Sequence, residues 1–109
     1  MADIEKDDEA QAAIGRGSDA SGAPLLTVSG ELDMSNAREL EAAIDAVAGE
    51  RPARLVFDVR DLRFIDSAGL AVLLGAAARA GQVVLREPSP AVSRVIEITG
   101  LSTLLTIEQ

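Results

Sequence analysis

From Pro24 onward, short apolar segments of strand length alternate with longer segments of helical period. The segment Arg54–Val59 has a continuously apolar centre, Leu55-Val56-Phe57, which is typical of a strand covered on both faces, as in a parallel sheet. Strands that alternate with helices predict an α/β fold, in which helices pack against a small mixed sheet in a single domain. The other expected strands cover Leu25–Val28, Gln82–Leu85 and Leu104–Ile107.

Three helices are expected between these strands, and the first begins at Asn36. Glu39 follows three residues later, a spacing that resembles a capping box. Apolar residues then recur with the period of one helix face, and Gly49 is expected to end the helix. These residues are Leu40, Ala43, Ile44 and Val47.

The two later helices have clear termini as well. The second is expected over Ala68–Ala80, which is apolar nearly all round and is followed by a glycine. The third should begin with Ser89 as its N-cap and Pro90 as its first helical residue, and it should end at Gly100. Proline is favoured at that first position because the N–H it lacks would have no partner there.

The first 23 residues have a different composition from the rest of the chain. They carry six acidic and two basic residues and show no sustained apolar period. We therefore expect a largely disordered acidic leader over residues 1–23, with a possible first strand near residues 10–14, and one domain over residues 24–109. The leader has no basic region followed by an apolar region, so it is not expected to be a signal peptide.

Composition excludes several kinds of function. The chain has no Cys, His, Trp or Tyr, so thiolate and imidazole catalysis and Cys/His metal sites are ruled out, and we expect no catalytic residues, metal or cofactor. The net charge of −8 argues against nucleic acid as a partner. The longest apolar run, Ala68–Ala78, is about half as long as a membrane span, so we expect a cytoplasmic protein without membrane insertion.

The segment Phe64–Leu70 lies where an apolar strand gives way to an apolar helix, and it contains polar residues that a core does not need. Ser67 would stand beside the first free N–H groups of the helix. Its hydroxyl is then either a helix cap or a place where a phosphate can be accommodated. Asp66 could supply the cap in its place, so the residues alone leave these alternatives open.

Three blocks of the sequence resemble the STAS domain family, and within it the bacterial anti-sigma-factor antagonists. The middle block is the most specific of the three. The resemblance covers residues 24–109. The blocks are Ser29-Gly30-Glu31-Leu32-Asp33, Phe57-Asp58-Val59-Arg60-Asp61-Leu62-Arg63-Phe64-Ile65-Asp66-Ser67-Ala68-Gly69-Leu70, and Ser89-Pro90-Ala91-Val92 continuing to Ile98-Thr99-Gly100-Leu101.

The resemblance implies a phosphorylation switch in the regulation of stress-responsive transcription. Ser67 would be phosphorylated by an anti-sigma factor that is itself a GHKL-type serine kinase. The unphosphorylated protein would bind that anti-sigma factor and so free the sigma factor, and a PP2C-type phosphatase would reset the switch. The free protein would be a monomer.

The residues around Ser67 are the expected partner-binding surface. Gly69 would let a partner's backbone approach, whereas close packing within the helix is the expected reason for Gly75. Leu70, Leu73 and Leu74 should be buried, which leaves an exposed apolar edge on the other side of the helix. The expected contact residues are Asp33, Asp66, Ala68, Gly69, Ala71, Val72 and Gly75.

Two other functions were weighed against this one. A STAS domain can also serve as the docking subunit of a bacterial lipid-transport ABC system, without a phosphorylation switch. An enzyme or nucleotide hydrolase is disfavoured, because the chain has no phosphate-binding Gly-x-x-x-x-Gly-Lys-Ser/Thr loop and its only lysine is Lys6. Asp33 could also be a simple turn-forming residue after the Leu25–Val28 strand, without a role in partner binding.

Overall fold

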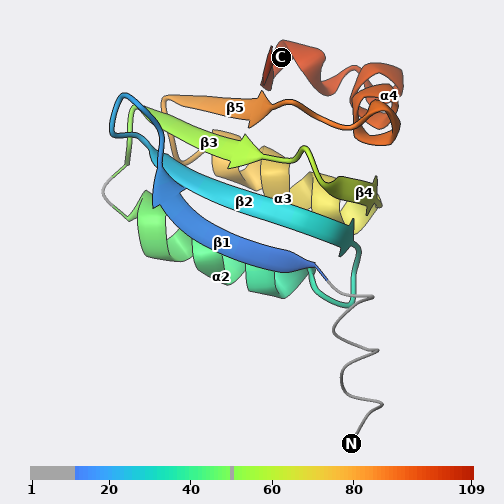
Figure 1. The fold of residues 1–109 in the computed structure, drawn as a ribbon, viewed down its shortest axis with the longest axis horizontal. Helices are drawn as coiled ribbons and strands as arrows, with labels where there is room; N and C mark the ends of the chain where they lie inside the picture. Colours follow the sequence, from blue (N-terminus) through green and yellow to red (C-terminus); the bar gives the residue numbers. More distant parts are fainter. Residues whose placement is uncertain (1–11, 50) are drawn as a thin grey trace, which may run out of the picture.

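The computed structural model describes residues 12–49 and 51–109. A six-stranded sheet runs through the protein, with α2 and α3 side by side on one face and α4 beside β4 (Figure 1). The mixed α/β fold expected from the sequence is confirmed. The strands are β1 (Ala13–Ser18), β2 (Pro24–Leu32), β3 (Arg54–Asp58), β4 (Leu62–Ile65), β5 (Gln82–Arg86) and β6 (Thr106–Glu108); the helices are α2 (Ala37–Ala48), α3 (Ser67–Ala77), α4 (Pro90–Thr99) and the 3-10 turn η1 (Leu101–Thr103).

The main strand order is β1-β2-β3-β5-β6, with β1 antiparallel to β2 and the other pairs parallel. Strand β2 pairs with β3 in its first half and with β4 in its second half. The register shifts between Gly30 and Glu31, where Gly30 has a φ of +89° and donates its N–H to the Asp61 carbonyl at 3.0 Å. Glycine adopts this backbone conformation without steric cost. Because β2 changes its pairing partner from β3 to β4 at this point, β4 lies at the end of the sheet from which α3 begins.

The core is aliphatic apart from one aromatic ring. Leu55, Val56 and Phe57 are all fully buried, which confirms that β3 is covered on both faces. Side chains from the three helices complete the core, among them Leu40, Leu73 and Ile96.

The helix termini confirm some of the expected caps and correct one. The Ser89 hydroxyl accepts the Val92 N–H at 3.4 Å, and Gly100 follows α4 with a φ of +76°, as expected. Helix α2 also begins directly after Asn36 and ends at Gly49, but Asn36 makes no side-chain cap, so the capping box with Glu39 is wrong.

Asn36 is instead a buried polar residue, only 1% exposed. Its Nδ2 donates to the Glu31 carbonyl at 2.8 Å, and its Oδ1 accepts the Asp33 N–H at 3.0 Å. Both polar atoms of the amide therefore take part in closing the β2–α2 turn, and the side chain does not cap the helix.

Several strands differ from the sequence-based expectation. Strand β2 covers Pro24–Leu32, which is longer than the expected Leu25–Val28, and β6 covers Thr106–Glu108 in place of Leu104–Ile107. Strand β1 covers Ala13–Ser18 and overlaps the expected 10–14 segment at only two residues, so residues 12–23 of the expected leader form a strand and a turn. Gly15 and Gly17 interrupt the apolar alternation that would mark a strand, and pairing with β2 supplies the order. Residues 1–11 lie outside the described part. Strand β4 was not separately expected.

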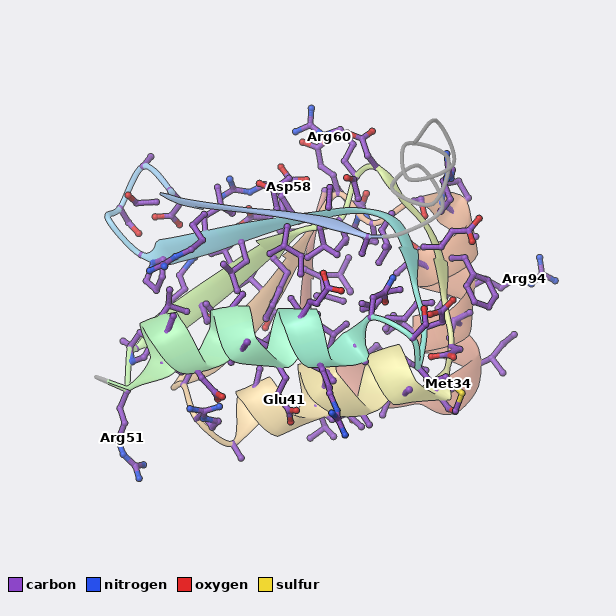
Figure 2. The ribbon with its side chains drawn as sticks, turned by 90° about the horizontal axis from the view of Figure 1, so that it is seen from below. Met34, Glu41, Arg51, Asp58, Arg60 and Arg94 are labelled. Atoms are coloured by element: carbon purple, nitrogen blue, oxygen red, sulfur yellow. The ribbon has the colours of Figure 1, made fainter. Side chains whose placement is uncertain are left out.

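Charged side chains connect the strands on the sheet face away from α2, the side where Figure 2 shows Asp58 and Arg60. Arg54 contacts Asp19 at 3.3 Å and Glu108 at 3.1 Å. Arg86 donates to the second oxygen of Glu108 at 3.0 Å. These ion pairs join the β1–β2 turn, β3, β5 and β6.

Candidate functional site

The junction between β4 and α3 is organised by Asp66. Strand β4 ends at Ile65, and the Asp66 backbone is extended, with φ −106° and ψ −172°. One carboxylate oxygen, Oδ1, accepts the Gly69 N–H at 3.0 Å, and the Asp66 carbonyl accepts the Leu70 N–H at the same distance. Asp66, and not Ser67, is therefore the N-cap of α3.

Ser67 is the first residue of α3, and it is exposed. Its hydroxyl makes no hydrogen bond to any residue that the structure describes, and within the same residues the N–H groups of Ser67 and Ala68 also lack partners. A hydroxyl in this position is accessible to a modifying enzyme. The unpartnered N–H groups and the positive end of the helix dipole would stabilise an anion attached to it.

The second carboxylate oxygen of Asp66 reaches the loop between β2 and α2. Its Oδ2 accepts the Met34 N–H at 3.2 Å, and the Asp66 N–H donates to the Leu32 carbonyl at 3.1 Å. The Met34 side chain is 80% exposed, and Figure 2 shows it beside the start of α3. Loop and helix terminus are thus one continuous surface.

Asp33 lies in the same loop, but its carboxylate serves its own turn. Oδ1 accepts the Ser35 N–H at 2.9 Å and also the Ser35 hydroxyl. The hydroxyl bond and then the backbone bond lower the pKa of Asp33 below its usual value. Among the described residues no hydrogen bond joins Asp33 to Ser67. The bonds of the Asp33 carboxylate are those of a turn-forming residue.

Gly69 differs from the expectation that it admits a partner. It is buried, and a Cβ at this position would stand 2.8 Å from Ile65 Cγ1 and 2.9 Å from Leu32 Cδ2. The close approach of α3 to the ends of β2 and β4 therefore accounts for this glycine. Because it is buried, Gly69 offers a partner no surface.

Gly75 is the glycine that lies on the outside, contrary to the packing role expected for it. It is exposed, and a Cβ there would meet no atom within 4 Å. Ala71 is exposed one turn earlier, while Ala68 and Val72 are half-buried. Together with Ser67 these residues form an apolar edge of small side chains on α3.

Met34 and Phe64 are exposed apolar residues that were not expected from the sequence as contact residues. Phe64, which is 49% exposed, lies on β4 two residues before Asp66. No periodic pattern marks either position, and the only available signal is that Met34 stands between the polar residues Asp33 and Ser35. Ile98 and Leu104 are similarly exposed, at 75% and 60%, but they lie in α4 and after η1.

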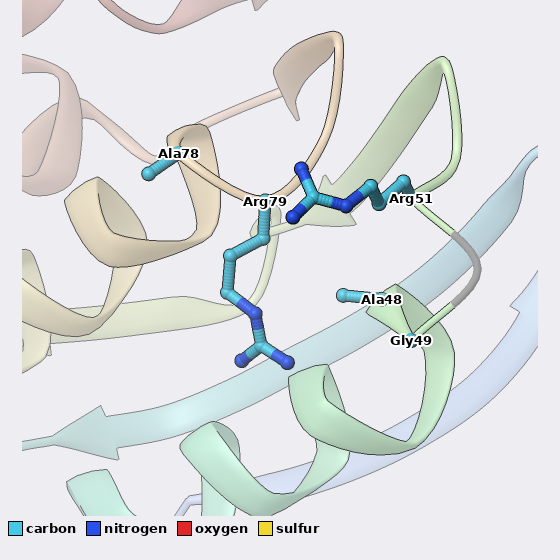
Figure 3. Close-up of a pocket in the computed structure, with 5 residues that line it drawn as sticks. All are labelled: Ala48, Gly49, Arg51, Ala78 and Arg79. Carbon is cyan, nitrogen blue, oxygen red and sulfur yellow. The ribbon is translucent and has the colours of Figure 1, made fainter.

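A cleft of about 180 Å³ lies at the other end of the helices, between the ends of α2 and α3 (Figure 3). Arg51 and Arg79 line it, and Arg79 forms an ion pair with Asp45. Figure 2 shows Arg51 at the opposite end of the protein from Met34. Both arginines lie just beyond the C-terminal ends of their helices, where the helix dipole favours positive charge.

Residues 12–49 and 51–109 contain neither a metal-binding cluster nor a membrane-spanning helix. Within these ranges the acidic side chains form no group that could hold a metal ion. None of the helices found there is both long enough and apolar enough to cross a bilayer.

The fold and the site together define a small α/β domain with an exposed serine at a helix start. The family model described as "Mlab, STAS domain" matches residues 17–106. The chain belongs to the STAS domain family.

Relatives of this chain are named as anti-sigma factor antagonists. The chain is 36% identical over 66 residues to the anti-sigma-F factor antagonist RsfB of Mycobacterium tuberculosis, covering 61% of this chain and 54% of that protein. It therefore spans about half the length of RsfB. It is 33% identical over 87 residues to the putative anti-sigma factor antagonist BtrV of Bordetella bronchiseptica, covering 76% and 75% of the two chains.

A solved structure agrees with these relatives. An anti-sigma factor antagonist from Mycobacterium paratuberculosis superimposes with a TM-score of 0.78 at 34% identity, covering 90% of this chain and 86% of that one. All three of these proteins are named as anti-sigma factor antagonists, BtrV as a putative one.

Proposed function

We propose that this protein is an anti-sigma-factor antagonist whose binding is controlled by phosphorylation of Ser67. The observation that carries the proposal is the exposed, unbonded hydroxyl of Ser67 at the first position of α3, with the cap supplied by Asp66. The hydroxyl is therefore available for modification without loss of the helix cap. The names of RsfB and BtrV support the role.

The physics of the site is suited to a switch that leaves the fold intact. A phosphate adds about −1.5 to −2 charge at neutral pH. The N–H groups of Ser67 and Ala68 and the helix dipole stabilise that charge in the free protein. A partner packed against Ser67 and Ala71 would instead meet a bulky dianion beside the Asp66 carboxylate.

The proposed regulatory cycle is the one that the resemblance to anti-sigma-factor antagonists implies. The unphosphorylated protein, a cytoplasmic monomer, binds the anti-sigma factor and so releases a sigma factor for transcription. The anti-sigma factor, a GHKL-type serine kinase, phosphorylates Ser67 and ends the interaction. A PP2C-type phosphatase restores the binding form.

The test is the intact mass of the protein after incubation with ATP and each candidate anti-sigma kinase of the source bacterium, followed by peptide mapping. One added phosphate on Ser67 is expected, absent in Ser67→Ala. Ser35→Ala is the matched control, because Ser35 is also exposed but its hydroxyl is bonded to Asp33. Phosphate on Ser35, or no modification by any candidate, would contradict the proposal.

A second candidate function is a STAS docking subunit of a bacterial lipid-transport ABC system. The observation that favours it is the description of the matching family model, "Mlab, STAS domain". In that case the partner would bind constitutively, and Ser67 would remain unmodified. The mass measurement distinguishes the two candidates.

A further inference from the structure

A large apolar side chain, that of Met34, is exposed to solvent in the loop that is hydrogen-bonded to Asp66 at the start of α3. Met34 is 80% exposed, although the loop that carries it is tightly bonded. Isolated exposed apolar residues are common on protein surfaces. Met34 is unusual because its backbone is fixed by a side chain from the neighbouring helix terminus.

Two sets of hydrogen bonds fix the loop. Asp66 Oδ2 accepts the Met34 N–H at 3.2 Å from a position 32 residues later in the chain. The buried Asn36 side chain joins the Glu31 carbonyl, at 2.8 Å, to the Asp33 N–H, at 3.0 Å. The backbone on both sides of Met34 is therefore held in place before any partner arrives.

This order would benefit binding, because a contact residue on a fixed backbone loses less entropy when it is buried by a partner. Methionine is also enriched in protein interfaces, where its flexible side chain adapts to apolar pockets. Ile98 and Leu104 are exposed as well, but they belong to α4 and the segment after η1. Met34 shares Asp66 with the Ser67 helix terminus, so its surface is continuous with the proposed interface (Figure 2).

We propose that Met34 is a specificity-determining contact for the anti-sigma factor and that Asp66 is the residue that positions it. The partner would present an apolar pocket for Met34 next to the surface that contacts Ser67. This inference rests on the proposed function. It adds a second determinant of recognition to the phosphorylatable hydroxyl.

The positioning role can be tested in the protein alone with Asp66→Asn. The asparagine oxygen can still accept the Gly69 N–H and cap α3, but its amide N–H group cannot accept the Met34 N–H. Amide hydrogen exchange at Met34 is expected to accelerate by about tenfold or more, while Gly69 stays protected. Unchanged exchange at Met34, or equal acceleration at both amides, would overturn the positioning role.

The contact role is tested by the affinities of the variants for each candidate anti-sigma factor. Met34→Ala is expected to weaken binding by about tenfold or more. Leu104→Ala is the matched control and is expected to change affinity by less than about twofold, because Leu104 is exposed elsewhere. The double variant Asp66→Asn/Met34→Ala should bind no more weakly than Asp66→Asn alone, since Met34 is no longer held in its binding position in Asp66→Asn.

The outcomes separate this inference from the proposed function. Binding of the wild type together with equal binding of Met34→Ala, or an equal loss in Leu104→Ala, would overturn the inference and leave the proposed function standing. Fully additive losses in the double variant would remove Asp66 as the positioning residue. If the wild type binds no candidate, both fail together.

Discussion

The Asp66 carboxylate uses each of its oxygens for a different neighbour. One oxygen caps α3 through Gly69, and the other accepts the Met34 N–H. Ser67 is thereby relieved of the capping role that its sequence position suggests. Because the Ser67 hydroxyl makes no hydrogen bond that the helix needs, its modification should not lower the free energy of unfolding.

Ser67→Asp should separate binding from stability. The added carboxylate lies in the first turn of α3, where the helix dipole favours negative charge, so the free energy of unfolding should stay unchanged or rise by up to about 1 kcal/mol. Affinity for the anti-sigma factor should fall, although one carboxylate imitates a phosphate imperfectly. Chemical denaturation and titration calorimetry measure the two quantities.

Ser67→Ala is the control for that substitution, and it should bind as the wild type does while resisting phosphorylation. Equal affinity of the wild type and Ser67→Asp would count against the switch. A large loss of stability in Ser67→Ala would instead show that the Ser67 hydroxyl is needed by the fold.

Two glycines of α3 should respond to alanine in opposite ways. At Gly69 the new Cβ would stand 2.8 Å from Ile65 Cγ1 and 2.9 Å from Leu32 Cγ, so Gly69→Ala should destabilise the protein by about 1–3 kcal/mol. At Gly75 the space is open, and Gly75→Ala should stabilise it by about 0.5–1 kcal/mol through helix propensity. Urea denaturation of both variants provides the comparison, and equal signs would refute it.

At the scale of elements, the short strand β6 depends on side chains as well as on backbone pairing. It has three residues, and its Glu108 contacts Arg54 at 3.1 Å and Arg86 at 3.0 Å. The Arg86 hydrogen bond, followed by the one from Arg54, lowers the pKa of Glu108 below its ordinary value of 4.5. A carboxylate with a lowered pKa stabilises the fold when it is ionised.

Glu108→Gln should therefore destabilise the protein in a pH-dependent way. The loss relative to the wild type should be complete above the ordinary pKa of 4.5. It should shrink as the pH falls through the lowered pKa of the folded state, because Glu108 then becomes protonated in the folded wild type too. Unfolding free energies near neutral pH and at acidic pH test this, with Glu97→Gln on the exposed side of α4 as the control. A pH-independent difference would contradict the ion-pair explanation.

The elements that could be predicted from the sequence are those whose signal is local. Leu55-Val56-Phe57 marks a strand buried on both faces, and Ser89-Pro90 with Gly100 marks both ends of α4. Strand β4 has four residues, directly after a charged turn, and it becomes a strand because β2 turns toward it at Gly30. Strand β1 likewise depends on pairing with β2.

The site was predictable only in part, because some of its contacts join residues that are far apart in the sequence. The Ser67 junction could be found from its polar residues between apolar elements. Helix α3, however, is apolar nearly all round, so no periodicity showed that Gly69 faces inward and Gly75 outward. The bond from Met34 to Asp66 spans 32 residues, and no local pattern indicates it.

At the scale of the whole molecule, the ends of the sheet differ in character. The start of α3 and the Met34 loop form one end, and the arginines beside the last turns of α2 and α3 lie at the other (Figures 2 and 3). The proposed recognition residues are confined to the first end. Substitutions at Arg51 should therefore leave partner binding unaffected.

The stability of the whole domain is expected to be modest. The core is small and aliphatic, with Phe57 as its only buried aromatic residue among those described. We expect a free energy of unfolding near the lower end of about 5–15 kcal/mol. Chemical denaturation followed by circular dichroism measures it, and a midpoint well above that of ordinary small domains would contradict the expectation.

The exposed position of Met34 has a practical consequence in a chain that contains neither tryptophan nor tyrosine. Met34→Trp would introduce a single indole fluorophore into a protein that has no other tryptophan or tyrosine, on a backbone already fixed by Asp66 and Asn36. Its emission would report the polarity around that one side chain. The loop could thus be converted into an optical sensor that follows occupancy of the surface in real time.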